Sequence, residues 1–122
     1  MNQGGAHIIM DIHGCDPGKL DDMDFCKNTL EGAAIAARST IVKTAFHKFA
    51  PQGVTGFCLV QESHLSIHTW PECGFAAVDI FMCGREGDPQ KARKYILEAL
   101  GGEEVQVISI ERGKIPSCEK DS

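Results

Sequence analysis

The segment from Glu62 to Glu72 concentrates reactive side chains. Its eleven residues include two serines, two histidines, a tryptophan and two carboxylates. Alternation along this segment predicts a strand, since successive side chains of a strand point to opposite faces. We expect one face to carry Leu65, Ile67 and Thr69, and the other to carry His64, Ser66, His68 and Trp70. One face of this strand is therefore the candidate reactive surface.

Two common uses of these residue types are disfavoured. A Ser-His-Asp hydrolase needs a nucleophile elbow such as G-x-S-x-G, and Glu62-Ser63-His64 lacks that pattern. A metal site would need converging ligands, but His64 and His68 lie about 13 Å apart on a regular strand. The six cysteines form no C-x-x-C pair. The sequence therefore predicts neither a hydrolase triad nor a metal site.

The composition is that of an ordinary globular domain. The chain has 122 residues, 43% hydrophobic residues and a net charge of -5, which fits one domain spanning residues 1–122. The scattered basic residues argue against a nucleic-acid partner. Without a signal-like start or a long apolar run, we expect no membrane association and a cytoplasmic location, with reduced cysteines that mostly serve as small core residues.

The elements that must position the reactive segment follow from turn and cap signals. Asp16-Pro17 and Asp88-Pro89 each predict a helix start, for helices at residues 17–38 and 89–100. Pro51-Gln52-Gly53 predicts a hairpin turn, and Pro71-Glu72-Cys73-Gly74 predicts another turn. Besides the reactive segment, strands are expected at residues 6–13, 40–49, 54–60, 75–83 and 105–110. Little order is expected beyond Gly113.

The predicted fold class is α+β. We expect a two-layer sandwich in which an antiparallel sheet carries two helices on one face. The pattern Met10-Asp11-Ile12-x-x-Cys15 followed by Asp16-Pro17 resembles Val78-Asp79-Ile80-x-x-Cys83 followed by Asp88-Pro89. This echo is compatible with an internal duplication and a pseudo-twofold repeat.

Five motifs of the chain occur together in one known family. They are Thr40-Ile41-Val42, Phe46-His47-x-Phe49-x-Pro51-x-Gly53-Val54-x-Gly56, Glu62-Ser63-His64-Leu65-x-Ile67-His68-Thr69-Trp70-Pro71-Glu72, Asp79-x-Phe81-x-Cys83-Gly84 and Glu111-Arg112-Gly113. With these motifs the chain resembles the bacterial and archaeal S-adenosylmethionine decarboxylase proenzymes. The resemblance covers nearly the whole chain apart from both ends.

This resemblance implies a zymogen that cuts its own backbone. Cleavage between Glu62 and Ser63 would give a β chain, residues 1–62, and an α chain, residues 63–122. The Ser63 hydroxyl would attack the Glu62 carbonyl, and Thr55 would assist processing at a position where many relatives have serine. His68 would then remove the Ser63 α-proton, since a neutral imidazole is available at pH 7. Residue 63 would become a pyruvoyl group, so no external cofactor is expected.

The same resemblance implies a carboxy-lyase. The pyruvoyl carbonyl would form a Schiff base with S-adenosylmethionine and accept the electrons released with CO2. Cys83 would donate a proton to the resulting carbanion, because a thiol is mainly protonated at neutral pH. The product, decarboxylated S-adenosylmethionine, is the aminopropyl donor for spermidine and hence for polyamine biosynthesis.

Substrate-binding residues are also implied by the resemblance. Phe49 would stack on adenine, Glu72 would accept hydrogen bonds from the ribose, and Leu65 would line the site; Trp70 is expected to pack at its edge. The family forms dimers of cleaved αβ units, a heterotetramer, so Phe49 is a candidate to serve the neighbouring protomer. Two alternatives stay open: a pyruvoyl-dependent arginine or ornithine decarboxylase, and a nucleoside-binding relative without processing.

One expectation concerns geometry. Ser63 and His68 have opposite parity and would lie about 17 Å apart on an ideal strand. We therefore predict a bend or bulge between Glu62 and Leu65, or a strand that starts only after Ser63.

Overall fold

A single antiparallel sheet forms the centre of the protein. The computed structural model describes residues 5–83 and 87–113. Six strands pair in the order β2-β3-β4-β5-β1-β6, and each pair of neighbours is antiparallel. Their bounds are β1 Gly5–His13, β2 Thr40–Lys48, β3 Val54–Gln61, β4 Ser63–Trp70, β5 Phe75–Cys83 and β6 Glu103–Arg112. The predicted tail beyond Gly113 lies outside the described residues.

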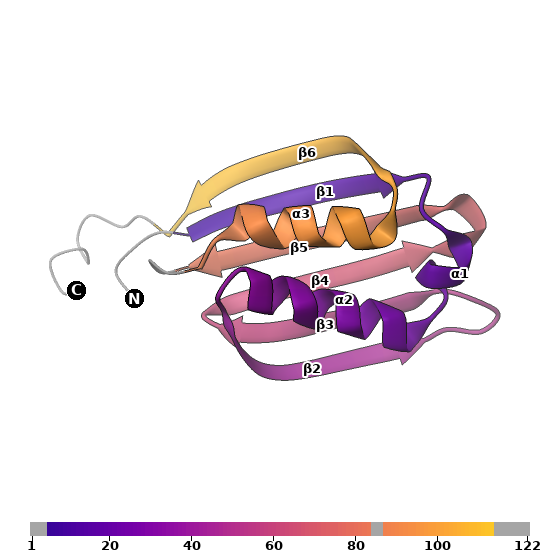
Figure 1. The fold of residues 1–122 in the computed structure, drawn as a ribbon, viewed down its shortest axis with the longest axis horizontal. Helices are drawn as coiled ribbons and strands as arrows, with labels where there is room; N and C mark the ends of the chain where they lie inside the picture. The colour runs from indigo at the N-terminus through magenta and orange to yellow at the C-terminus, as the bar shows by residue number, and fades with distance from the viewer. Residues whose placement is uncertain (1–4, 84–86, 114–122) are drawn as a thin grey trace, which may run out of the picture.

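The helices lie on one face of this sheet (Figure 1). They are α1 Pro17–Leu20, α2 Met23–Ala36 and α3 Pro89–Leu100, and a short 3-10 turn, η1, spans Pro71–Cys73. Aspartates cap all three helices: Asp16 accepts from the N–H of Gly18, Asp22 from Phe25, and Asp88 from Gln90 and Lys91. The expected α+β sandwich with an antiparallel sheet and two main helices is confirmed.

The prediction of one continuous helix over residues 17–38 is wrong. The chain leaves the helix after Leu20 and starts a new one at Met23, which ends at Ala36. The physical cause is a second N-cap, because the Asp22 carboxylate accepts from the Phe25 N–H at 3.0 Å. Asp21, between the two helices, is thereby available for a contact elsewhere.

The core lies between the sheet and the helices. Along β4, Leu65 and Ile67 are fully buried and Thr69 is 6% exposed, whereas His68 and Trp70 are exposed. The predicted alternation of the reactive segment is therefore confirmed. The opposite face of the sheet has no helix over it (Figure 1) and leaves large apolar side chains exposed, among them Phe57, Leu59, Ile108 and Ile110.

Three of the five described cysteines belong to this core. Cys15, Cys26 and Cys58 are buried, as expected, whereas Cys73 is exposed; Cys118 lies outside the described residues. Burial raises the pKa of the Cys26 thiol to about 12 and that of Cys58 to about 11. No helix in the part of the chain that the structure describes is long and apolar enough to cross a membrane.

Candidate active site

Ser63 occupies a strained position at a tight hairpin turn. Val60 of β3 pairs with Ser63 of β4, so that only Gln61 and Glu62 lie between these two paired residues. Ser63 has a φ of 126°, a region that residues other than glycine rarely adopt. Backbone strain of this kind costs about 1–3 kcal/mol and is concentrated at functional sites. The irregular backbone is therefore found at the bond that the sequence singled out for cleavage.

The Ser63 side chain meets Cys83 at the end of β5. Its Oγ lies 3.2 Å from the Cys83 Sγ, and either atom can donate the hydrogen bond. The Cys83 N–H donates to the Glu62 carbonyl oxygen at 3.3 Å, which ties the turn to β5. Regular alternation would place the two side chains on opposite faces, and the positive φ of Ser63 explains why they meet. The structure thus brings three predicted residues together.

Gly5 makes room for the Cys83 thiol. It pairs with Cys83 in the register of β1 and β5. A Cβ atom built at Gly5 would lie 2.6 Å from the Cys83 Sγ and 2.7 Å from the Met82 carbonyl oxygen. Side chains essentially never approach so closely, so a residue larger than glycine would displace the thiol. The sequence analysis did not single out Gly5, because its partner is 78 positions away in the chain.

A second group of predicted residues lies at the other end of β4. Thr55 pairs with His68, and the Thr55 Oγ1 lies 3.1 Å from the His68 Nδ1. Both residues line a pocket of about 340 Å³. The complete lining is Phe49, Gln52, Gly53, Thr55, His68, Thr69, Trp70 and Glu72. The structure therefore brings Phe49, Thr55, His68 and Glu72 to one pocket, whereas the resemblance implied roles for Thr55 and His68 at the Glu62–Ser63 bond.

Three residues of this pocket were not predicted from the sequence. Gln52 and Gly53 belong to a segment that was interpreted only as a hairpin turn, and Thr69 was assigned to the buried face of its strand. Trp70 lies at the pocket as expected, with its ring centroid 5.1 Å from that of Phe75. The available signal for Gln52 and Gly53 was their place in a turn, because loops beside a strand that carries reactive residues often line a binding site.

The Ser63–Cys83 pair and the pocket that contains Thr55 and His68 are far apart within one chain. Five residue steps separate Ser63 from His68 along β4, whose pairing with β3 and β5 shows no register shift. The distance is therefore about 17 Å. The expected bulge between Glu62 and Leu65 is absent, and β4 includes Ser63, because the reversal of the chain is completed within the two-residue turn before it. Figure 1 places this turn at the left and the pocket end of the sheet at the right.

Leu65 is placed differently from the other predicted site residues. Its side chain is fully buried under the helices and is absent from the lining of the pocket. Within one chain it offers no surface to a ligand, so the resemblance to the family is its only support as a binding residue. Across residues 5–83 and 87–113, no group of three or more His, Cys, Asp or Glu side chains is arranged to hold a metal ion.

The fold and these two groups of residues define a small two-layer α+β protein with a serine hydroxyl beside a thiol. The sequence pattern of the S-adenosylmethionine decarboxylase family matches residues 6–113. The S-adenosylmethionine decarboxylase proenzyme of Geobacillus kaustophilus is 46% identical over 116 residues, which cover 95% of this chain and 93% of that protein. The proenzyme of Thermosipho africanus is 44% identical over 114 residues, covering 93% and 88%.

A solved structure agrees with these sequence matches. The crystal structure of the adenosylmethionine decarboxylase from Aquifex aeolicus superposes with a TM-score of 0.82 at 35% identity, covering 94% of this chain and 95% of that one. The chain belongs to the S-adenosylmethionine decarboxylase family. The family expected from the sequence motifs is thereby confirmed.

Proposed function

We propose that this S-adenosylmethionine decarboxylase forms its cofactor from its own Ser63, after cleaving the Glu62–Ser63 bond. The observation that carries the proposal is the strained serine at the β3–β4 turn, with its hydroxyl beside Cys83. The Ser63 Oγ attacks the Glu62 carbonyl carbon and converts the amide into an ester. Strain in the uncleaved turn favours this step, since opening the turn relieves the positive φ.

Cys83 serves as the proton donor of the proposed decarboxylation. Its Sγ lies 3.2 Å from the Ser63 Oγ, so the thiol faces the atom position where the reacting group forms. The pyruvoyl group, once formed, supplies a carbonyl that binds the substrate amine and takes up the electrons released with CO2. Gly5 leaves the space in which the thiol lies.

The pocket at the other end of β4 is proposed to bind the adenosyl part of the substrate. Its volume of about 340 Å³ falls within the usual range for small-ligand sites. Phe49 and Trp70 offer aromatic rings for a nucleobase, and the Glu72 carboxylate offers acceptors for ribose hydroxyls. His68, bonded to Thr55, is held in this pocket as the base of the processing reaction.

Two copies of the chain are needed if both groups act together. An imidazole about 17 Å from Ser63 cannot remove its α-proton directly, because proton transfer requires hydrogen-bond contact. We propose a dimer in which the Thr55–His68 pocket of one copy meets the Ser63–Cys83 end of its partner. The exposed apolar side chains on the helix-free face, Phe57, Leu59, Ile108 and Ile110, are suited to such an interface. After cleavage, this assembly is a heterotetramer of two αβ units.

Intact mass and a substrate panel test the proposal. The purified protein should split into residues 1–62 and a fragment that begins with a pyruvoyl-modified residue 63. The Ser63→Ala variant should remain a single chain without activity. The processed protein should release CO2 from S-adenosylmethionine, whereas turnover of arginine or ornithine alone would assign a different substrate. A chain that stays intact after long incubation would indicate a nucleoside-binding protein without the cofactor.

A further inference from the structure

The rim of the pocket is a loop that other parts of the fold hold in place. Residues 49–53 connect β2 to β3 and contribute Phe49, Gln52 and Gly53 to the pocket. Within the loop, the Phe49 N–H donates to the Gly53 carbonyl oxygen at 2.8 Å. Phe49 is 45% exposed, so its ring depends on the loop backbone for its position.

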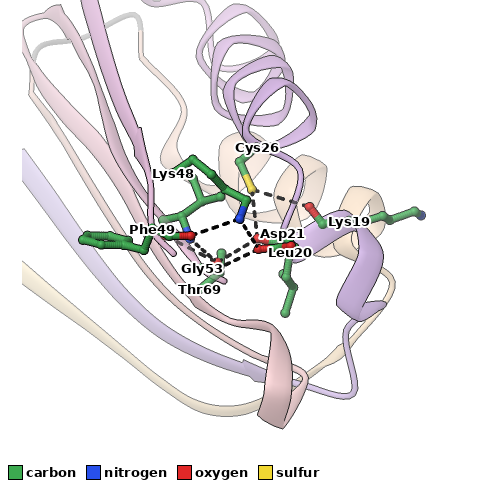
Figure 2. Close-up of polar contacts among 9 residues, drawn as sticks. Lys19, Leu20, Asp21, Cys26, Lys48, Phe49, Gly53 and Thr69 are labelled. Carbon is green, nitrogen blue, oxygen red and sulfur yellow. Dashed lines mark hydrogen bonds and ion pairs between the residues drawn. The ribbon is translucent and has the colours of Figure 1, made fainter. Parts of the chain in front are cut away.

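Asp21, at the end of α1, binds this loop at two points. Its Oδ1 accepts the Gly53 N–H at 2.8 Å and also the Lys48 Nζ at 2.9 Å. The same Lys48 Nζ donates to the Phe49 carbonyl oxygen at 3.0 Å. The hydrogen bond from Gly53 and that from Lys48 lower the pKa of the Asp21 carboxyl, which is therefore ionised at neutral pH. One carboxylate thus fixes both ends of the loop (Figure 2).

Thr69 adds a second attachment beside the first. Its Oγ1 accepts the Val54 N–H at 2.9 Å and donates to the Leu20 carbonyl oxygen at 2.8 Å. The end of α1 is itself held by Cys26 of α2, whose Sγ contacts the carbonyl oxygens of Lys19 and Leu20. The chain at the end of α1 is therefore linked to the loop end in two ways: Asp21 accepts directly from Gly53, and Leu20 is connected to Val54 through Thr69. Figure 2 shows Leu20, Asp21, Gly53 and Thr69 close together at this point.

We propose that Asp21 is a positioning residue for the substrate pocket, acting through Lys48 and Gly53 on the ring of Phe49. Asp21 is absent from the pocket lining, and Figure 2 shows the Phe49 ring directed away from it. The carboxylate therefore acts through the loop backbone. The inference rests on the proposed role of the pocket in binding the adenosyl group.

A role in global stability alone is a poor explanation for this contact. The side chains of Asp21 and Lys48 are each 36% exposed, and half-exposed ion pairs add little to folding stability. A contact that orders a binding loop acts instead on affinity, because an unordered loop must lose its freedom when the ligand binds. Substrate affinity should therefore change more than the thermal midpoint or self-cleavage.

The test is a pair of substitutions at adjacent aspartates. Asp21→Ala removes the hydrogen bonds from Gly53 and Lys48 and should raise the KM for S-adenosylmethionine about tenfold or more, with kcat and cleavage within about twofold. Asp21→Asn keeps one acceptor oxygen and should raise KM about threefold. Asp22→Asn removes one negative charge at the adjacent position, where the carboxylate caps α2, and should leave KM unchanged.

A binding measurement separates this inference from the proposed function. Trp70 is the single tryptophan and lines the pocket, so its fluorescence should report binding of 5′-methylthioadenosine, a non-reacting adenosyl probe. Wild type without turnover or probe binding would overturn the proposed function. Wild type with both, and Asp21→Ala with unchanged KM and probe affinity, would overturn the inference alone. If Asp21→Ala fails to fold, Lys48→Met provides the same test: it removes the ion pair and should weaken the probe about threefold, and an unchanged affinity there would be equally decisive.

Discussion

The two ends of β4 differ in how their backbone is held. At the first end, Ser63 has a φ of 126° and closes a two-residue turn. At the second end, Thr69 and Asp21 anchor the pocket rim to α1 with side-chain hydrogen bonds. Strain thus accumulates where a bond is proposed to break, and anchoring accumulates where a small molecule is proposed to bind. Neither end of β4 combines a strained backbone with an anchored pocket rim.

Variants that each disable one end of β4 test whether the two ends act together. Ser63→Ala and His68→Ala chains should each remain uncleaved when expressed alone. When they are co-expressed and co-purified, intact mass should show cleaved His68→Ala chains, because the Ser63→Ala copy supplies the missing imidazole. Ser66→Ala, a serine of the same strand that neither end uses, serves as the control and should cleave normally. Complete absence of cleavage in the mixed dimer would refute the shared site.

A second prediction separates processing from turnover at the first end. Cys83→Ala should cleave at the turn, since the thiol has no part in the acyl shift, yet its kcat should fall about 100-fold or more with the loss of a general acid. Cleavage by intact mass and CO2 release measure the two steps independently. Cys73→Ala, which alters an exposed thiol, should match the wild type. Normal turnover by Cys83→Ala would show that Cys83 is not the proton donor in decarboxylation.

Gly5 tests whether the position of the thiol matters as well as its presence. Gly5→Ala should lower kcat about tenfold, because the new Cβ overlaps the Cys83 Sγ and moves the proton donor away from residue 63. In a Cys83→Ala background the same change should lower kcat little further, since the sulfur that it displaces is gone, although the close contact with the Met82 carbonyl oxygen remains. Full additivity of the two substitutions in kcat would show that Gly5 acts by another route.

The buried thiols supply the smallest expected effect. Burial raises the pKa of Cys58 to about 11 and that of Cys26 to about 12, so the unfolded chain loses these protons at lower pH than the folded one. Stability from these groups is full below about pH 9 and declines as the pH rises toward their folded values. Urea unfolding at pH 8 and pH 9.5 should show a loss of about 1–2 kcal/mol. The loss should be smaller in Cys58→Ala, and an equal loss would contradict this origin.

Most of the fold could be predicted because its signals are local. Alternation identified β4, and the Asp-Pro pairs at residues 16 and 88 identified two helix starts. The break between α1 and α2 was missed because Asp22 has no proline after it and apolar spacing continues across the gap. A doubled aspartate within a helical pattern was the available signal.

The site could be predicted only in part. Motifs named Ser63, His68 and Cys83, and the rise of a regular strand already separated His68 from Ser63, but no sequence rule places His68 beside Thr55. Those neighbours follow from strand register, which a two-residue turn fixed without the expected bulge. The contact between Asp21 and Gly53 spans 32 positions and exists only in the folded chain.

The strand order decides what becomes of the chain once it is cut. Cleavage after Glu62 would assign β1, β2 and β3 to one piece and β4, β5 and β6 to the other. In the sheet, β1 lies between β5 and β6, while β3 pairs with β4. The two pieces are therefore interleaved in the sheet. Separating them would break the backbone hydrogen bonds of three strand pairs: β1 with β5, β1 with β6, and β3 with β4. The severed protein is expected to stay one cooperative body, so that its newly made end remains beside the thiol.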